Sequence, residues 1–193
     1  MRQVLQILAL RSELQRSDLM EMVWPGLDRA KARPNLRATL LHLRRLLEPD
    51  RPSGEASFHV RLRGERVWLQ RSALISCDLW ETQAALEAGQ TAASAGRDQE
   101  ALEAYRKALG LWQVESCADV RDNDGVADEL RALDHAVQRA GSRAAERLLS
   151  QGRSDEAATI ASELLVRDPF DERAHDVAVG AHLATDDLAG PGV

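Results

Sequence analysis

A six-residue motif that occurs twice in the second half of the chain, with two substitutions, is the feature that most constrains the fold. Residues 96–101 (GRDQEA) recur as residues 152–157 (GRSDEA), 56 positions later. Self-similarity at a fixed offset predicts stacked copies of one supersecondary unit, each burying an apolar face against its neighbour. This half is rich in Ala, Leu and Glu and shows little β-branched alternation, so each unit is expected to be a pair of helices.

Small and apolar residues follow each copy at helical steps and predict where the paired helices cross. The matching positions are Ala101, Tyr105 and Ala108 in the first copy, Ala157, Ala161 and Leu164 in the second, and Gly89 and Ala145 in the preceding helices. The pattern is similar to half of a tetratricopeptide repeat, with a closing Pro169 where the first copy has Gln113. The offset exceeds the usual ~34 residues, so we expect an insertion over 113–125 and a long helix over 126–150. A last helix over 171–184 would cap the stack, and residues 190–192 (GPG) would fray.

The first half predicts three short helices. Apolar spacing and helix stop signals place them over residues 2–11, 18–24 and 34–48. Ser17 is the expected N-cap of the second helix, and Pro34 is expected in the first turn of the third.

The third of these helices has two unlike faces. At about 100° per residue, Leu36, Leu40, Leu43 and Leu47 fall within roughly 40° of one line and predict a buried stripe. The opposite face suits the major groove of DNA, where Arg reads guanine and Leu or Ala contacts thymine methyl groups. Its members are Arg37, Ala38, Leu41, His42 and Arg45, with Arg33 and Asn35 at the N-terminal end and Arg44 on a flank. The alternative is an ordinary solvated basic face.

Residues 57–70 predict a strand, a turn at Gly64 and a second strand. The alternating apolar set is Phe58, Val60, Leu62, Val67 and Leu69, and the polar set around the tip and outer face includes His59, Arg61, Arg63 and Arg66. Three helices followed by a basic hairpin is the order of a winged helix-turn-helix. In that fold the last helix enters the major groove, and the hairpin, called the wing, lies along the backbone or minor groove.

Charge divides the chain in the same place as the motifs do. Residues 1–75 carry 14 Arg and Lys against 8 Asp and Glu, a net +6, whereas residues 76–193 carry 11 against 23, a net −12, which together give the −6 of the whole chain. An asymmetry of this kind indicates two domains with different partners. We therefore expect a mainly α protein, with a winged helix-turn-helix over 1–75 and a tetratricopeptide-like helical repeat domain over 76–193.

With these features the chain resembles the SARP-type bacterial transcriptional activators. Members join a response-regulator-like winged helix to a helical repeat module, the bacterial transcriptional activator domain. The segments that carry the resemblance are residues 23–25 (VWP), 32–49 (ARPNLRATLLHLRRLLEP), 77–80 (CDLW), 108–112 (ALGLW) and 167–175 (RDPFDERAH). Members usually have strands before the first helix and continue beyond the third repeat helix, so the resemblance implies a shortened or minimal form.

The resemblance implies sequence-specific binding to double-stranded promoter DNA, dimer-like occupancy of repeated sites, and contact with RNA polymerase. Carried over by position, the base-reading residues are Arg37, Leu41, His42 and Arg45, and the wing residues are Arg61, Arg63 and Arg66. These sets agree with the faces that periodicity predicts. The alternative function is a protein-interaction adaptor that uses the acidic repeats, with a degenerate winged helix; folded domains without activity are a third reading.

Signatures of catalysis and metal binding are missing from the sequence. It has no Gly-rich phosphate loop, no H-E-x-x-H and no G-x-S-x-G. The five His lack ligand spacing, residues 122–125 lack the acids of a calcium loop, and Cys77 and Cys117 match no zinc spacing. The apolar start at residues 4–10 fits an amphipathic helix better than a signal peptide, and no apolar run of ~18 residues exists. We expect a cytoplasmic protein that is not an enzyme, has no cofactor or metal, and does not associate with membranes.

Overall fold

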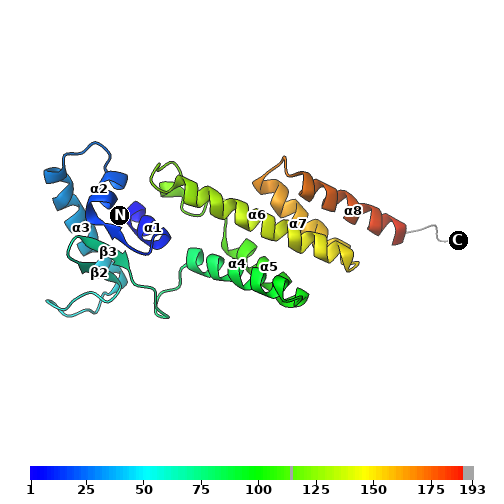
Figure 1. Ribbon diagram of the computed structural model, residues 1–193, viewed down its shortest axis with the longest axis horizontal. Coiled ribbons are helices and arrows are strands. Elements are labelled where there is room, and N and C mark those ends of the chain that lie inside the picture. The colour runs from blue at the N-terminus through cyan, green and yellow to red at the C-terminus, as the bar shows by residue number, and fades with distance from the viewer. Residues whose placement is uncertain (114, 189–193) are drawn as a thin grey trace. The chain divides into compact units, whose positions relative to one another are not determined.

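The computed structural model describes residues 1–113 and 115–188 and contains two compact units (Figure 1). The first unit comprises Met1–Cys77 together with Cys117–Arg131, and the second comprises Asp78–Ser116 and the chain from Ala132 onward. The described chain is mainly α, with one small antiparallel sheet, as the sequence predicts.

The elements of the first unit follow the order helix, strand, helix, helix, strand, strand. They are α1 (Arg2–Leu10), β1 (Leu14–Gln15), α2 (Arg16–Val23), α3 (Arg29–Leu47), β2 (Val60–Arg63) and β3 (Arg66–Leu69). The sheet has the order β1-β3-β2 and is antiparallel throughout. Gly64 has a φ of +59° in the two-residue turn between Arg63 and Arg66, which explains why a glycine stands there. This is the element order of a winged helix-turn-helix, with β2 and β3 forming the wing.

Two helix starts differ from the sequence prediction. The helix α3 begins at Arg29 rather than at Pro34, because Asp28 is its N-cap and accepts a hydrogen bond from the Ala30 amide at 2.8 Å. Pro34 therefore lies inside the helix, where it lacks an N–H for one intrahelical bond. Ser17 is not the N-cap of α2, which begins at Arg16, and its hydroxyl donates to Asp18 instead.

The core of the first unit forms where the three helices meet the sheet. Leu36, Leu40 and Leu43 are at most 3% exposed, so the predicted leucine stripe of α3 is confirmed, and Leu47 is half-buried. Apolar residues of the other elements complete the core: Val4, Ile7, Leu8, Leu19, Val60 and Val67. Packing of α3 through this stripe determines which of its side chains face outward.

A segment from the second half of the sequence belongs to the first unit. The 3-10 helix η1 (Ala118–Val120) contacts α1, and Val120 and Val126 are fully buried. The side-chain amide of Asn123 donates through Nδ2 to the Met22 carbonyl at 2.6 Å. The Arg11 guanidinium donates to the Gly125 carbonyl and to the Glu129 carboxylate, both at 2.6 Å. Residues 117–125, which were expected to be part of an insertion, thus belong to the unit that holds the wing.

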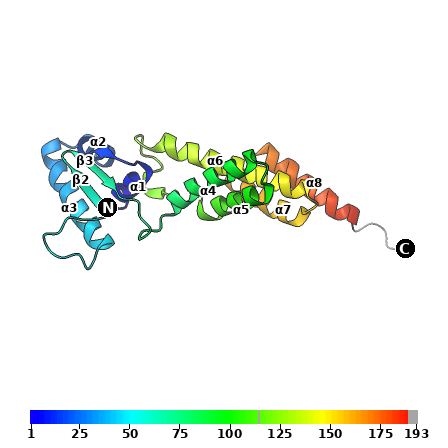
Figure 2. The ribbon, with the colours of Figure 1, turned by 60° about the horizontal axis from the view of Figure 1, so that its bottom comes forward.

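The second unit is built from antiparallel helix pairs (Figure 2). Its helices are α4 (Asp78–Ser94), α5 (Asp98–Leu111), most of α6 (Ala127–Ser150), α7 (Ser154–Arg167) and α8 (Glu172–Leu188). The last helix runs past the predicted end at residue 184, and residues 190–192 lie outside the described part. Among the described residues, the helices are too short or too polar to cross a membrane.

The repeated hexapeptide forms the same turn twice. Gly96 and Gly152 have φ values of +70° and +73°, a left-handed conformation that favours glycine after a helix. In each copy the next residue, an arginine, donates its amide to a carbonyl five residues earlier at 2.9 Å: Arg97 to Ala92, and Arg153 to Leu148. The 56-residue offset read from the sequence is therefore a structural repeat.

The positions at which the paired helices cross also correspond in the two copies, although the sizes of the residues at them differ. A Cβ added at Gly89 would lie 2.5 Å from Cδ1 of the buried Tyr105 ring, so glycine is required for this close approach. The equivalent positions in the second copy are Ala145 and Ala161, both 0% exposed. A glycine facing a large ring in one copy is replaced by two alanines in the other.

Candidate nucleic-acid interface

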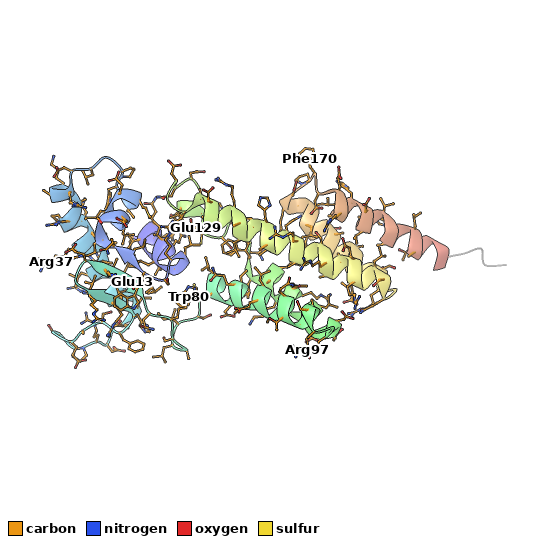
Figure 3. All side chains as sticks on the ribbon, viewed as in Figure 1. Glu13, Arg37, Trp80, Arg97, Glu129 and Phe170 are labelled. Carbon is orange, nitrogen blue, oxygen red and sulfur yellow. The ribbon has the colours of Figure 1, made fainter. Side chains whose placement is uncertain are left out.

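The face of α3 opposite its leucine stripe is exposed. Arg37, Leu41, His42 and Arg45 all lie on it, and Leu41 is 43% exposed. Figure 3 shows Arg37 projecting outward from the helix. Among the described residues, Arg37 and Arg45 have no hydrogen-bond or ion-pair partner. The structure thus brings the predicted base-reading residues together on one helical face, with their cationic groups uncompensated.

Three more residues from the predicted set lie on the same helix in different surroundings. Arg33 and Asn35 are exposed in the first half of α3. Arg44 is half-buried, and its Nε and Nη2 donate to the Val60 carbonyl at 3.2 and 3.1 Å. Burial and the nearby charge of Arg51 lower the pKa of Arg44, and Glu48 opposes them. Arg44 therefore connects α3 to the first strand of the wing.

The wing presents its arginines to solvent. Arg61, Arg63 and Arg66 are exposed, and Arg66 forms an ion pair with Glu13 at 3.1 Å. Ion pairs between exposed groups contribute little and exchange readily with other anions. Arg61 also donates weakly to the Ser57 carbonyl, at 3.4 Å.

The apolar alternation predicted for the wing is only partly correct. Phe58 is 49% exposed, whereas His59, expected on the outer face, is 6% exposed. The reason is that β2 begins at Val60, so residues 57–59 belong to the preceding loop, and the strand pattern does not apply to them. Leu62 faces the same side as Val60 but remains 39% exposed, because it lines an open cavity beside α3.

A half-buried carboxylate directly after α3 fixes that loop. Glu48 Oε1 accepts from Ser57 Oγ at 2.6 Å and from the His59 amide at 2.7 Å, and its Oε2 lies 3.2 Å from Arg51 Nε. Burial would raise the pKa of Glu48, but the hydrogen bonds from Ser57 and the backbone outweigh it and leave the pKa lowered. Together with Arg44, this carboxylate holds the wing against α3. Sequence reasoning missed Glu48, because its partners lie across a loop of no regular pattern.

The described residues contain no group of three or more His, Cys, Asp or Glu that could hold a metal ion. Cys77 and Cys117 are not joined by a disulfide. The arrangement provides cationic and apolar side chains on an exposed helix and hairpin, which is a binding surface.

The second half of the chain matches a known protein family. Residues 77–189 match the family model described as the bacterial transcriptional activator domain, which covers more than half of the chain. No curated protein matches the chain.

Proposed function

The chain belongs to the bacterial transcriptional activator domain family, as found in SARP regulators, and we propose that it binds specific promoter sequences through α3 and the wing. The family consists of transcriptional activators rather than enzymes. In this proposal α3 enters the major groove, and the wing lies along the phosphate backbone.

The outward face of α3 carries the proposal. Arg37, His42 and Arg45 share that face with Leu41, while the leucine stripe fixes the helix from behind. Arginine can donate two parallel hydrogen bonds to guanine, and an exposed leucine can contact a thymine methyl group. A helix presented in this way offers both kinds of contact at once.

The wing supports the same function by a different contribution. Arg61 and Arg63 are exposed on β2, and the ion pair of Arg66 with Glu13 is solvent-exposed. Contacts of such residues with phosphates position a protein on the duplex and make its affinity dependent on salt, without reading sequence.

Selection of bound duplexes from a random library tests the proposal, followed by binding measurements on the selected sequence. Arg45→Ala is expected to cost about 1–3 kcal/mol and to relax preference at one base pair. Arg63→Ala should weaken binding to all sequences alike and lower the salt slope by about one. Arg139→Ala, in the second unit on the exposed side of α6, is the matched control. It should change neither the affinity for the selected duplex nor the salt slope. Absence of salt-sensitive duplex binding at low ionic strength would refute the proposal.

Contact with another protein is a second, compatible candidate, and it rests on the second unit. Phe170, which follows α7 (Figure 3), is 88% exposed, and Val166 is 78% exposed. Exposed apolar side chains that form one contiguous patch mark sites of contact between proteins. The partner in this proposal is RNA polymerase or a second copy of the chain. Sedimentation of the chain alone and binding to purified polymerase test it, and Phe170→Ser should weaken the association that is found. Unchanged association in that variant would exclude this surface.

A further inference from the structure

A cavity of about 440 Å³ opens between α2, α3 and the wing. Apolar side chains line part of it, namely Met20, Leu36, Leu40 and Leu62. The remaining lining is charged and consists of Arg16, Arg33, Arg37, Arg44 and Glu65. Four guanidinium groups therefore line one cavity with a single carboxylate.

This arrangement of charge is unfavourable in the free protein. Arg33 and Arg37 are four residues apart on α3, a spacing at which like charges destabilise a helix. Neither has a hydrogen-bond or ion-pair partner among the residues that the structure describes.

Glu65 compensates only one of the four cations. Its carboxylate pairs with Arg16, and its backbone carbonyl accepts from the Arg16 amide at 2.7 Å, which holds the wing tip at the start of α2. The Nε of Arg16 is buried and has no partner in the described structure. Arg44 donates to a backbone carbonyl, which carries no formal charge. The cavity thus keeps an excess of positive charge and at least one unsatisfied donor.

We propose that this cavity is a phosphate-binding pocket, in which Glu65 holds Arg16 when no phosphate is bound. A phosphate offers several oxygens to guanidinium forks that converge from different directions, and arginine forms paired hydrogen bonds with it. The apolar lining leaves room for the organic group that carries the phosphate. A bound phosphate competes with Glu65 for Arg16.

The phosphate can come from two sources, and the chemistry is the same for both. One is the backbone of a DNA duplex, which rests on the proposed function, since Arg37 is also one of the predicted base-reading residues of α3. The other is a free phosphorylated small molecule. The experiment therefore needs one arm for each source.

In the duplex arm, the full chain and its variants bind a selected duplex over a range of salt concentrations. Arg16→Gln, and the double variant Arg33→Gln with Arg37→Gln, are expected to bind roughly tenfold more weakly, and the salt slope should fall by about one for each phosphate that the variant no longer binds. Glu65→Gln should bind roughly threefold more tightly, because it removes the competing carboxylate. Arg2→Gln is the matched control, since Arg2 is exposed on α1 outside the cavity, and its affinity should be unchanged.

In the second arm, pyrophosphate alone is titrated into the same proteins by calorimetry. Binding that the arginine variants abolish and Glu65→Gln strengthens assigns the pocket to a free phosphate. Weaker binding of Arg16→Gln confined to the duplex arm, with a lower salt slope and unchanged base preference, assigns it to the backbone. The proposal is overturned if folded arginine variants match Arg2→Gln in both arms. If the wild-type chain binds no duplex, the proposed function fails, and the pyrophosphate arm alone then decides on the pocket.

Discussion

Substitution of Gly89 by alanine tests the close approach of α4 and α5 most directly. The new Cβ would lie 2.5 Å from Tyr105 Cδ1, closer still to Cε1, and 3.2 Å from Cζ. The contacted atoms belong to a ring that is only 5% exposed and has no flexible end to move away. Overpacking of this kind typically costs 1–3 kcal/mol, and two contacts this short place it near the top, about 3 kcal/mol.

Helix propensity acts in the opposite direction. Alanine is favoured over glycine by about 1 kcal/mol inside a helix such as α4. We therefore expect Gly89→Ala to lower the free energy of unfolding of the second unit by about 2 kcal/mol. Tyr105→Ala alone should cost about 3–5 kcal/mol, because it removes buried apolar surface and leaves a cavity behind.

The double variant reverses the sign of the effect at position 89. In a Tyr105→Ala background the clash is gone, so Gly89→Ala should stabilise by about 1 kcal/mol, a coupling of about 3 kcal/mol between the two sites. The second repeat already carries this pair as Ala145 and Ala161, both fully buried. Tyr105→Phe is the matched control, because it keeps the ring and should keep the full cost of Gly89→Ala.

Urea unfolding followed by circular dichroism gives these free energies, and hydrogen exchange of amides in α4 and α5 assigns them to this helix pair. The reasoning is refuted if Gly89→Ala is as stable as the wild type. It is equally refuted if the substitution costs the same with and without the Tyr105 ring, because contact with the ring would then not be the cause.

Three further predictions concern a turn, an ion pair and a carboxylate. Gly152→Ala should lower the stability of the second unit by about 1 kcal/mol in urea unfolding, because φ is +73° there, whereas helical Gly110→Ala, with open space at its Cβ, should not destabilise. Arg11→Ala removes donors to the Gly125 carbonyl and Glu129. In thermal unfolding it should lower the free energy of unfolding of the first unit by about 1–2 kcal/mol. The pKa of Glu48 is lowered by folding, so its contribution is complete above about pH 4.3 and is lost as pH falls through the lowered value. Glu48→Gln should therefore flatten the acid side of a stability profile measured from pH 3 to 7.

Sequence patterns correctly predicted the elements that depend on contacts between neighbours in the sequence. The leucines of α3 follow the helical period, and three of the four are fully buried. Gly64 marks a two-residue turn, which needs a positive φ. The hexapeptide at residues 96 and 152 specifies one helix end twice, because glycine and the following residue form the same bonds in both copies. In each case the sequence neighbours that form the pattern also form the contacts.

The features that were missed depend on partners far away in the sequence. Strand β1 has only two residues, and Leu14 pairs with Val67, so nothing within residues 14–15 indicates a strand. The sequence predicted Arg45 on the outward face of α3 and Arg44 on a flank, but it could not show that Arg44 binds the Val60 carbonyl. Successive residues on a helical wheel are separated by about 100°, so the different faces of these two arginines follow from the sequence. The contact that Arg44 makes does not follow from it, because the carbonyl belongs to a strand elsewhere in the chain.

The segment from Cys117 to Arg131 lowers the net positive charge of the unit that contains α3 and the wing. It carries five acids and two arginines, so the first unit has a net charge of about +3 rather than the +6 of residues 1–75. Net charge alone is therefore a weak reason to expect attraction to DNA, and the placement of charge matters more. Two of the acids have partners in or next to α1: Asp119 accepts a hydrogen bond from Gln6, and Glu129 forms an ion pair with Arg11. Arg37 and Arg45 on α3 have no such partner in the described structure. Folding thus pairs Arg11, which follows α1, with Glu129 and leaves Arg37 and Arg45 available on α3, which is the distribution that our proposal of a helix entering the major groove requires.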